Sequence, residues 1–189
     1  MTDEKTALRA ALERRRAEAA RADAAEALAR IGLKGLGVAP GVVVAGYVAF
    51  RSEIDPAPLL AGLAAAGVRL ALPRTPPRGS PAPLTFHLWA PDSPLARGAF
   101  GVLEPLADAR IVTPDVVLAP LLGFDRQGRR LGYGQGHYDR TLAALRAQRA
   151  TRFIGVAYAA QEVDALPEEA HDVRLDAVLT ERGLVACGR

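Results

Sequence analysis

Residues Arg129 to Arg140 combine glycines and charged side chains in a pattern that suits phosphate binding. Gly132, Gly134 and Gly136 alternate with larger residues, and backbone N–H groups can approach an anion closely at glycine because it has no Cβ atom. An apolar run before the loop predicts a buried strand over residues 116–124, and helix formers follow the loop. A helix N-terminus carries partial positive charge. Strand, glycine loop and helix start therefore predict a phosphate-binding site.

Arginines flank the glycines and separate this loop from the two common nucleotide-binding loops. Arg129, Arg130 and Arg140 present forked N–H donors that match phosphate oxygens. The loop lacks the lysine of a P-loop, and His137 stands where a dinucleotide-binding fingerprint has its third glycine. Glycine spacing alone also fits a loop that crosses a crowded sheet edge. The arginines and Asp139 favour the phosphate-binding interpretation.

The composition indicates a globular domain and excludes several classes of function. The chain has 189 residues, of which 50% are hydrophobic and 24% charged, enough for one domain with a full core. A net charge of only +3 argues against a dedicated duplex-binding protein. The single cysteine, Cys187, excludes an internal disulfide and cysteine-based zinc sites. With no secretory signal and no run of ~18 apolar residues, we expect a cytoplasmic protein.

Predicted strands and helices alternate around the loop. Residues 3–30 contain no glycine or proline and predict one long helix on the domain surface. Runs of β-branched and other apolar residues predict strands at residues 42–50, 68–72, 84–90, 116–124, 153–158 and 177–179. This order predicts a three-layer αβα sandwich, a Rossmann-like open sheet with largely parallel strands. Its ligands should bind at the carboxyl ends of the strands.

Several separated motifs resemble those of the 5-formyltetrahydrofolate cyclo-ligase (methenyltetrahydrofolate synthetase) family. The most specific runs from Phe124 to Arg140 and reads Phe-Asp-x-x-Gly-x-Arg-Leu-Gly-x-Gly-x-Gly-x-Tyr-Asp-Arg. Supporting motifs are Lys5-x-x-x-Arg9, Ser52-Glu53-Ile54-Asp55, Leu72-Pro73-Arg74, Phe100-Gly101-Val102-Leu103-Glu104-Pro105 and His171-Asp172-Val173. The resemblance implies one cyclo-ligase domain over residues 1–189, in which residues 1–30 form an N-terminal helix packed on the α/β core. Gln135, His137 and Leu103 depart from the family pattern.

This resemblance implies an ATP-dependent ligase of folate one-carbon metabolism. The γ-phosphoryl group of ATP would pass to the formyl oxygen of 5-formyltetrahydrofolate and make it a leaving group. N10 would then attack the activated carbon to give 5,10-methenyltetrahydrofolate, with release of ADP and phosphate. Such an enzyme must align two ligands and neutralise phosphoryl charge. The implied partners are 5-formyltetrahydrofolate, ATP as cosubstrate and Mg²⁺, without nucleic acid or membrane, and the chain is expected to be a monomer or a weak homodimer.

The family pattern also implies roles for individual residues. The implied ATP-binding residues are Lys5, Arg9, Arg130, Leu131, Gly132, Tyr133, Gly134, Gln135, Gly136, His137 and Tyr138. The implied folate-binding residues are Glu53, Phe100, Gly134, Gln135, Gly136, His137 and Tyr138. Arg130 and Tyr138 are the implied catalytic residues, and Asp139 and Asp172 the implied Mg²⁺ ligands. The Glu53 carboxylate could accept pterin N–H groups, and Trp89 joins Phe100 as a candidate to flank a flat ring.

Lys5 and Arg9 stand four residues apart and therefore share one helical face. Two like charges near a helix N-terminus repel each other and oppose the helix dipole, so local stability gives no reason for the pair. An anionic partner explains it, and the resemblance suggests the ATP phosphates. We therefore expect the first helix to fold across the ligand crevice.

Two other functional interpretations stay open from the sequence. A nucleotide-dependent oxidoreductase with an atypical glycine loop would need an acidic residue at the end of the strand after the loop helix. That strand ends Tyr158-Ala159-Ala160, and Glu162 comes slightly late. A non-catalytic family member that binds folate or nucleotide without turnover is the second alternative, and the intact Arg130 and Asp139 argue against it.

Overall fold

Parallel strands form the centre of the protein, as the alternation of elements predicts. The elements of the computed structural model, which describes residues 3–169 and 172–188, are α1 (Asp3–Ala19), α2 (Ala24–Gly35), β1 (Val43–Ala45), α3 (Ala57–Ala65), β2 (Arg69–Arg74), β3 (Thr85–Trp89), β4 (Leu95–Arg97), β5 (Leu103–Pro105), β6 (Ile111–Val112), β7 (Val116–Pro120), β8 (Gly123–Phe124), β9 (Arg130–Leu131), α4 (His137–Gln148), β10 (Arg152–Val156), the 3₁₀ helix η1 (Ala159–Gln161), β11 (Ala177–Thr180) and β12 (Gly183–Ala186). The main sheet has the order β12-β11-β10-β7-β1-β2-β3-β6. Its inner strands β11, β10, β7, β1 and β2 are parallel, and the outer strands β12, β3 and β6 pair antiparallel with their neighbours. His171 of the quoted motif lies outside the described residues.

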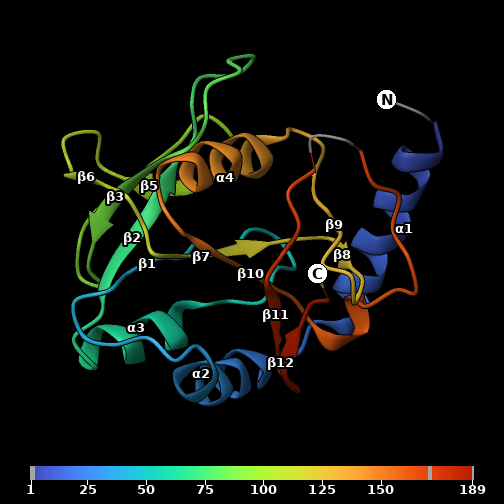
Figure 1. Ribbon diagram of the computed structural model, residues 1–189, viewed down its shortest axis with the longest axis horizontal. Coiled ribbons are helices and arrows are strands. Elements are labelled where there is room, and N and C mark those ends of the chain that lie inside the picture. Colours follow the sequence, from blue (N-terminus) through green and yellow to red (C-terminus); the bar gives the residue numbers. More distant parts are fainter. Residues whose placement is uncertain (1–2, 170–171, 189) are drawn as a thin grey trace.

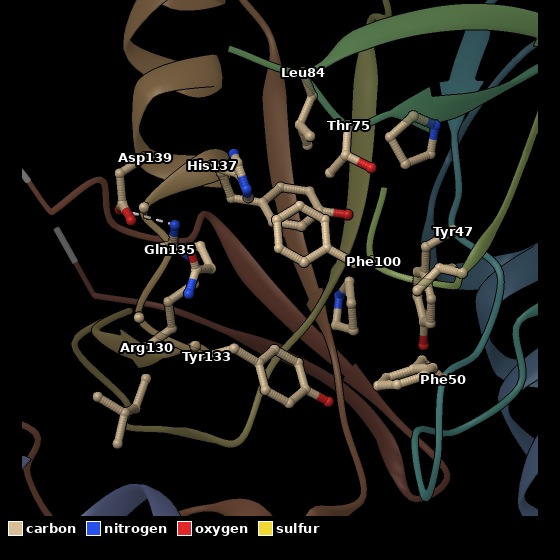
Figure 2. A pocket seen from close by; sticks show the side chains of 18 of the residues that line it. Tyr47, Phe50, Thr75, Leu84, Phe100, Arg130, Tyr133, Gln135, His137 and Asp139 are labelled. Carbon is tan, nitrogen blue, oxygen red and sulfur yellow. Dashed lines mark hydrogen bonds and ion pairs between the residues drawn. The ribbon is translucent and has the colours of Figure 1, made fainter. Parts of the chain in front are cut away.

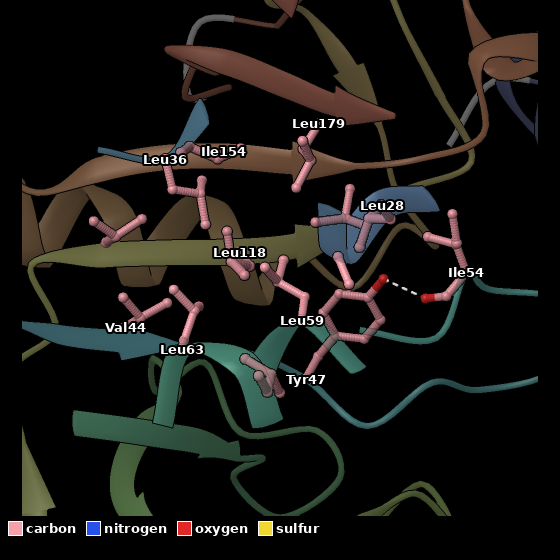
Figure 3. Packing of buried hydrophobic residues seen from close by; sticks show 14 of the residues in the cluster. Leu28, Leu36, Val44, Tyr47, Ile54, Leu59, Leu63, Leu118, Ile154 and Leu179 are labelled. Carbon is pink, nitrogen blue, oxygen red and sulfur yellow. Dashed lines mark hydrogen bonds between the residues drawn. The ribbon is translucent and has the colours of Figure 1, made fainter. Parts of the chain in front are cut away.

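Helices cover both faces of the sheet, which confirms the three-layer αβα prediction (Figure 1). α2 and α3 lie on one face, where Leu28 and Leu59 meet Leu118 and Ile154 of the sheet (Figure 3). α4 lies on the other face and buries Leu142 in a second cluster. Apolar residues on both faces of the inner strands explain why those strands read as continuous apolar runs.

The prediction of one helix over residues 3–30 is wrong, because the structure has two. Residues 20–23 leave the helical conformation between α1 and α2, although they contain no glycine or proline. Tertiary packing causes the break: α2 buries Ala24 and Leu28 in the core beside α3, whereas α1 packs Leu12 in a separate cluster. One straight helix over residues 3–30 could not place Leu12 and Leu28 in these two separate clusters. None of the helices in the described part of the chain is long and apolar enough to cross a membrane.

The sheet topology predicts a ligand crevice on the side of the sheet where α1 lies. β1 pairs with β2 on one side and β7 on the other, with Val44 aligned to Leu70 and Val116. From β1 the chain continues to β2 and β3 on one side, whereas from β7 it continues to β10 and β11 on the other, so the strand order reverses between β1 and β7. Ligands of open α/β sheets bind at such a switch point, outside the carboxyl ends of the strands. α1 lies beyond those ends (Figure 1), where Leu12 packs with Leu122 and other buried residues.

Candidate active site

A cavity of about 530 Å³ opens at the carboxyl ends of the parallel strands (Figure 2). Tyr47, Thr75 and Pro120 line it at or just beyond the ends of β1, β2 and β7. All the site residues that the family pattern implies line this cavity, namely Lys5, Arg9, Glu53, Phe100, Arg130, Leu131, Gly132, Tyr133, Gly134, Gln135, Gly136, His137, Tyr138, Asp139 and Asp172. The fold thus brings together the segments that the sequence could only name separately.

The glycine loop owes its shape to two left-handed residues. Gly134 has φ +88° and Gly136 φ +64°, conformations that side chains with a Cβ atom rarely adopt. Gly136 is the N-cap of α4, and α4 begins at His137, which lines the cavity. The N-terminal end of α4 therefore opens on the cavity, where its partial positive charge favours an anion.

Arg130 and Asp139 form an ion pair that joins the loop to α4 (Figure 2). Arg130 Nη2 donates to Asp139 Oδ1 at 2.8 Å, and its Nη1 donates to the carbonyl oxygen of Val173 at 3.1 Å. The Val173 N–H donates to the same Asp139 oxygen at 3.1 Å, and the Arg130 guanidinium lies over the Phe153 ring. Arg130 is largely buried. The pair therefore fixes one wall of the cavity as well as placing charge in it.

The other two arginines of the motif do not line the cavity, contrary to their predicted place around the phosphate. Arg129 pairs with Asp125 and Glu168. Arg140 Nη2 lies 3.2 Å from His137 Nδ1. Since a guanidinium can only donate, Nδ1 is the acceptor and the His137 proton lies on Nε2. Burial lowers the pKa of His137 and Arg140 lowers it further, so the ring is neutral at neutral pH.

α1 brings Lys5 and Arg9 to the glycine loop, as the shared helical face predicts. Arg9 Nε donates to the carbonyl oxygen of Gly132 at 3.1 Å, and the Arg9 guanidinium lies beside Gly134. Lys5 pairs with Glu169 across the cavity wall. Arg9 thus contacts the loop where phosphate is expected, and Lys5 lines the same cavity.

Glu53 belongs to a buried polar cluster that the sequence did not reveal. The Tyr133 hydroxyl donates to Glu53 Oε1 at 2.7 Å, and the Phe50 N–H donates to Oε2 at 2.8 Å. Arg16 of α1 donates from Nη1 to the Tyr133 oxygen at 2.6 Å, and this nitrogen lies 3.7 Å from Glu53 Oε1. Burial raises the pKa of Glu53, and the hydrogen bonds and Arg16 oppose that shift. The cluster joins α1, the loop after β1 and the glycine loop.

Aromatic rings line the centre of the cavity. Phe100 meets the His137 ring edge-on at 5.6 Å between centroids (Figure 2). Tyr138, which also lines the cavity, stacks on Phe153 at 6.2 Å between centroids. Burial raises the pKa of Tyr138, so its hydroxyl stays protonated and can donate a hydrogen bond. The expectation that Trp89 flanks the ligand is wrong, because Trp89 lines a separate shallow groove beside α3. Phe100 is therefore, of the two residues proposed to flank a flat ring, the one that lines the cavity.

The carboxylates fit a metal that is shared with a phosphate. No group of three or more His, Cys, Asp or Glu side chains within residues 3–169 and 172–188 could form an all-protein metal site. Mg²⁺ is commonly held by one or two carboxylates together with substrate phosphates and water. Asp139 and Asp172 both line the cavity, and Val173, next to Asp172, contacts Asp139. The two side chains therefore suit a metal that arrives with a nucleotide.

Two features of the cavity were missed from the sequence. Arg16 lies seven residues after Arg9, two helical turns along the same face, and this spacing could have identified it. Glu104 lines the cavity and accepts hydrogen bonds from the backbone N–H and the hydroxyl of Thr75. Burial raises the pKa of Glu104. Glu104 lies inside a motif that was recognised, but only the fold shows that its side chain is buried.

The fold and the site define an α/β protein with a glycine loop and several cations around a cavity at the carboxyl ends of its parallel strands, where ligands of open α/β sheets bind. A family model described as the 5-formyltetrahydrofolate cyclo-ligase family matches residues 1–181. The chain therefore belongs to the 5-formyltetrahydrofolate cyclo-ligase family and is an ATP-dependent ligase of folate metabolism.

Individual relatives agree with this assignment. The 5-formyltetrahydrofolate cyclo-ligase of Escherichia coli K12 is 40% identical over 141 residues, 72% of this chain and 76% of that protein. The Mycolicibacterium smegmatis cyclo-ligase is 41% identical over 163 residues, 82% of this chain and 81% of that protein. The solved Aquifex aeolicus 5,10-methenyltetrahydrofolate synthetase has a TM-score of 0.72 at 28% identity and covers 98% of this chain and 94% of its own. The Mycoplasma pneumoniae synthetase structure has a TM-score of 0.70 at 25% identity, with coverage of 95% and 99%.

Proposed function

We propose that this cavity binds ATP and 5-formyltetrahydrofolate side by side and catalyses ring closure to 5,10-methenyltetrahydrofolate, with release of ADP and phosphate. One observation carries the proposal: a single cavity collects the glycine loop, two cations of α1 and the buried carboxylate of Glu53. A hydrogen bond from Tyr133, inside the loop, reaches Glu53 directly. The phosphate side and the folate side of the cavity are therefore in contact, as in-line transfer of a phosphoryl group between two ligands requires.

The glycine loop and α1 form the proposed ATP site. The loop N–H groups and the α4 N-terminus would surround the phosphates, and Lys5 and Arg9 would neutralise their charge. Arg130 would hold the loop and, with Tyr138, face the transferred group. Asp139 and Asp172 would hold Mg²⁺, which neutralises phosphoryl oxygens when bound.

The apolar and acidic part of the cavity would recognise the flat pterin heterocycle. Phe100 offers a ring face or edge, and Glu53 accepts N–H donors of the pterin. The loop residues Gln135 and His137 line the same cavity and would contact both ligands. The Nε2–H of His137 has no hydrogen-bond partner among the described residues and can donate to a ligand oxygen.

The direct test is growth of the near-ultraviolet absorbance of the methenyl product. Purified protein, 5-formyltetrahydrofolate, ATP and Mg²⁺ should give product, and omission of ATP should abolish it. A non-catalytic family member would bind both ligands without forming product. None of the relatives described above is an oxidoreductase, and ATP-dependent product formation without any nicotinamide cofactor in the assay contradicts that alternative.

The remaining expectations concern the setting of the enzyme. We propose a cytoplasmic protein whose partners are its two substrates, without nucleic acid or membrane. The low net charge and the single partly buried cysteine support this proposal. The proposed state is a monomer or a weak homodimer, which sedimentation at two protein concentrations tests.

A further inference from the structure

Arg16 is the most deeply buried charged side chain of the first helix. Its side chain is 1% exposed, whereas its neighbours Arg14 and Arg15 on the same helix are exposed. It lies beside the cavity without lining it, and its contacts are with Ser52, Glu53 and Tyr133. A buried guanidinium must be paired or it costs stability, so these three contacts account for its position.

The direction of each hydrogen bond in this cluster follows from the donor chemistry. Arg16 can only donate, so the Tyr133 oxygen accepts from it and the Tyr133 hydrogen points to Glu53. The Phe50 N–H also only donates, and it reaches the other oxygen of Glu53. Both carboxylate oxygens therefore accept, which is the pattern of an ionised carboxylate with a fixed plane. The remaining lone pairs of Glu53 are left for a ligand in the cavity.

Stability alone does not explain the cluster. A buried ion pair is often no more stable than well-packed apolar residues of the same volume. Arg16 Nη2 is also buried without a hydrogen-bond partner among the described residues, which is a further cost. Polar networks that cost stability are characteristic of functional sites.

We infer that Arg16 is a positioning residue for the folate side of the cavity. It acts through Tyr133 and through its own charge to keep the Glu53 carboxylate ionised and oriented toward the pterin. This inference rests on the proposed contact between Glu53 and folate. It does not extend to ATP, because Leu8 and Leu12 pack α1 against the domain independently of Arg16.

A positioning role for Arg16 predicts a change in the pH dependence of activity when Arg16 is replaced. The ionisable groups that face Glu53 are Arg16, Arg51, Tyr133, Tyr47 and Tyr138. Burial already raises the pKa of Glu53, and Arg16 holds it down. A carboxylate needed in its ionised form loses activity as the pH falls through its folded pKa. Removal of Arg16 raises that pKa further, so the acid limb of kcat/KM for folate must move to higher pH.

The test compares Arg16→Met with Arg15→Met, an exposed neighbour on the same helix. Arg16→Met should raise the KM for folate about tenfold or more and leave the KM for ATP within about twofold. Its acid limb should move up by about one pH unit, and Arg16→Lys should restore the limb. Arg15→Met should match the wild type in all three measurements. An unmoved acid limb, or equal losses for both substrates, would show that Arg16 only anchors the helix.

Two further variants keep the result decisive. If Arg16→Met does not fold, Arg16→Lys carries the test: it keeps the charge but loses the fork, so the KM for folate should rise about threefold or more, and a wild-type value overturns the inference. Glu53→Gln tests the underlying contact. If it leaves the KM for folate unchanged, the proposed folate contact fails and the inference with it. If Glu53→Gln raises the KM and Arg16→Met does not, the inference alone fails.

Discussion

Gly134→Ala is the sharpest test of the glycine loop, because Gly132 two residues earlier provides a matched control. At Gly134 the backbone has φ +88°, and a left-handed residue with a Cβ atom is strained by roughly 1–2 kcal/mol. The new Cβ would also lie 3.1 Å from Arg9 Cζ, closer than an ordinary van der Waals contact, so the guanidinium that donates to Gly132 must give way slightly. Alanine restricts the unfolded chain, which returns about 0.4–1 kcal/mol. The net loss is about 1 kcal/mol, or a fall in Tm of about 2–4 °C.

The same change should weaken ATP binding more than folate binding. Displacement of Arg9 and strain at the phosphate loop should raise the KM for ATP about fivefold, the equivalent of about 1 kcal/mol, with the KM for folate nearly unchanged. Gly132→Ala should keep or slightly raise Tm, because Gly132 has no left-handed φ and no described heavy atom lies within 4 Å of its ideal Cβ position. Thermal unfolding and steady-state kinetics provide the measurements. Equal Tm values for the two variants, or equal increases in both KM values for Gly134→Ala, would refute the reasoning.

Three other substitutions test separate parts of the structure. Replacing Lys5 and Arg9 together by alanine should raise the KM for ATP severalfold and leave folate binding without ATP almost unchanged; an unchanged KM for ATP would make this end of α1 a solvated surface. Asp139→Asn should lower kcat/KM for Mg²⁺–ATP strongly and, because it leaves the largely buried Arg130 without a charged partner, should also lower Tm; unchanged kinetics with lower Tm would make Asp139 structural only. Gly128→Ala should lower the free energy of unfolding by more than about 2 kcal/mol, because the left-handed φ of +82° adds strain and the new Cβ would lie 2.6 Å from a backbone carbonyl oxygen. A Tm equal to that of the wild type would contradict this.

Features that depend on local sequence were predictable. Glycines at alternate positions before a run of helix formers predict a loop that ends in a helix N-terminus, and α4 begins directly after Gly136. Apolar runs predict the inner strands because parallel strands are buried on both faces. The short strands β4, β5, β6 and β12 were not predicted, since they have only two to four residues each. β4 and β5 pair with each other in a separate sheet, and β6 and β12 lie at the edges of the main sheet. Short strands carry too few residues for a periodic signal.

Contacts between residues that lie far apart in the chain were decided by the tertiary structure alone. Nothing in residues 3–30 shows that the helix must break after Ala19, because the break follows from two packing sites in different parts of the domain. The sequence identified Glu53 as a candidate ligand contact, but only the fold placed Arg16 and Tyr133 beside it. A residue's type sets what it can donate, accept or bury. Its burial and its partner are set by which distant segments pack around it, and for Arg16 that difference separates a solvated helix charge from a buried one.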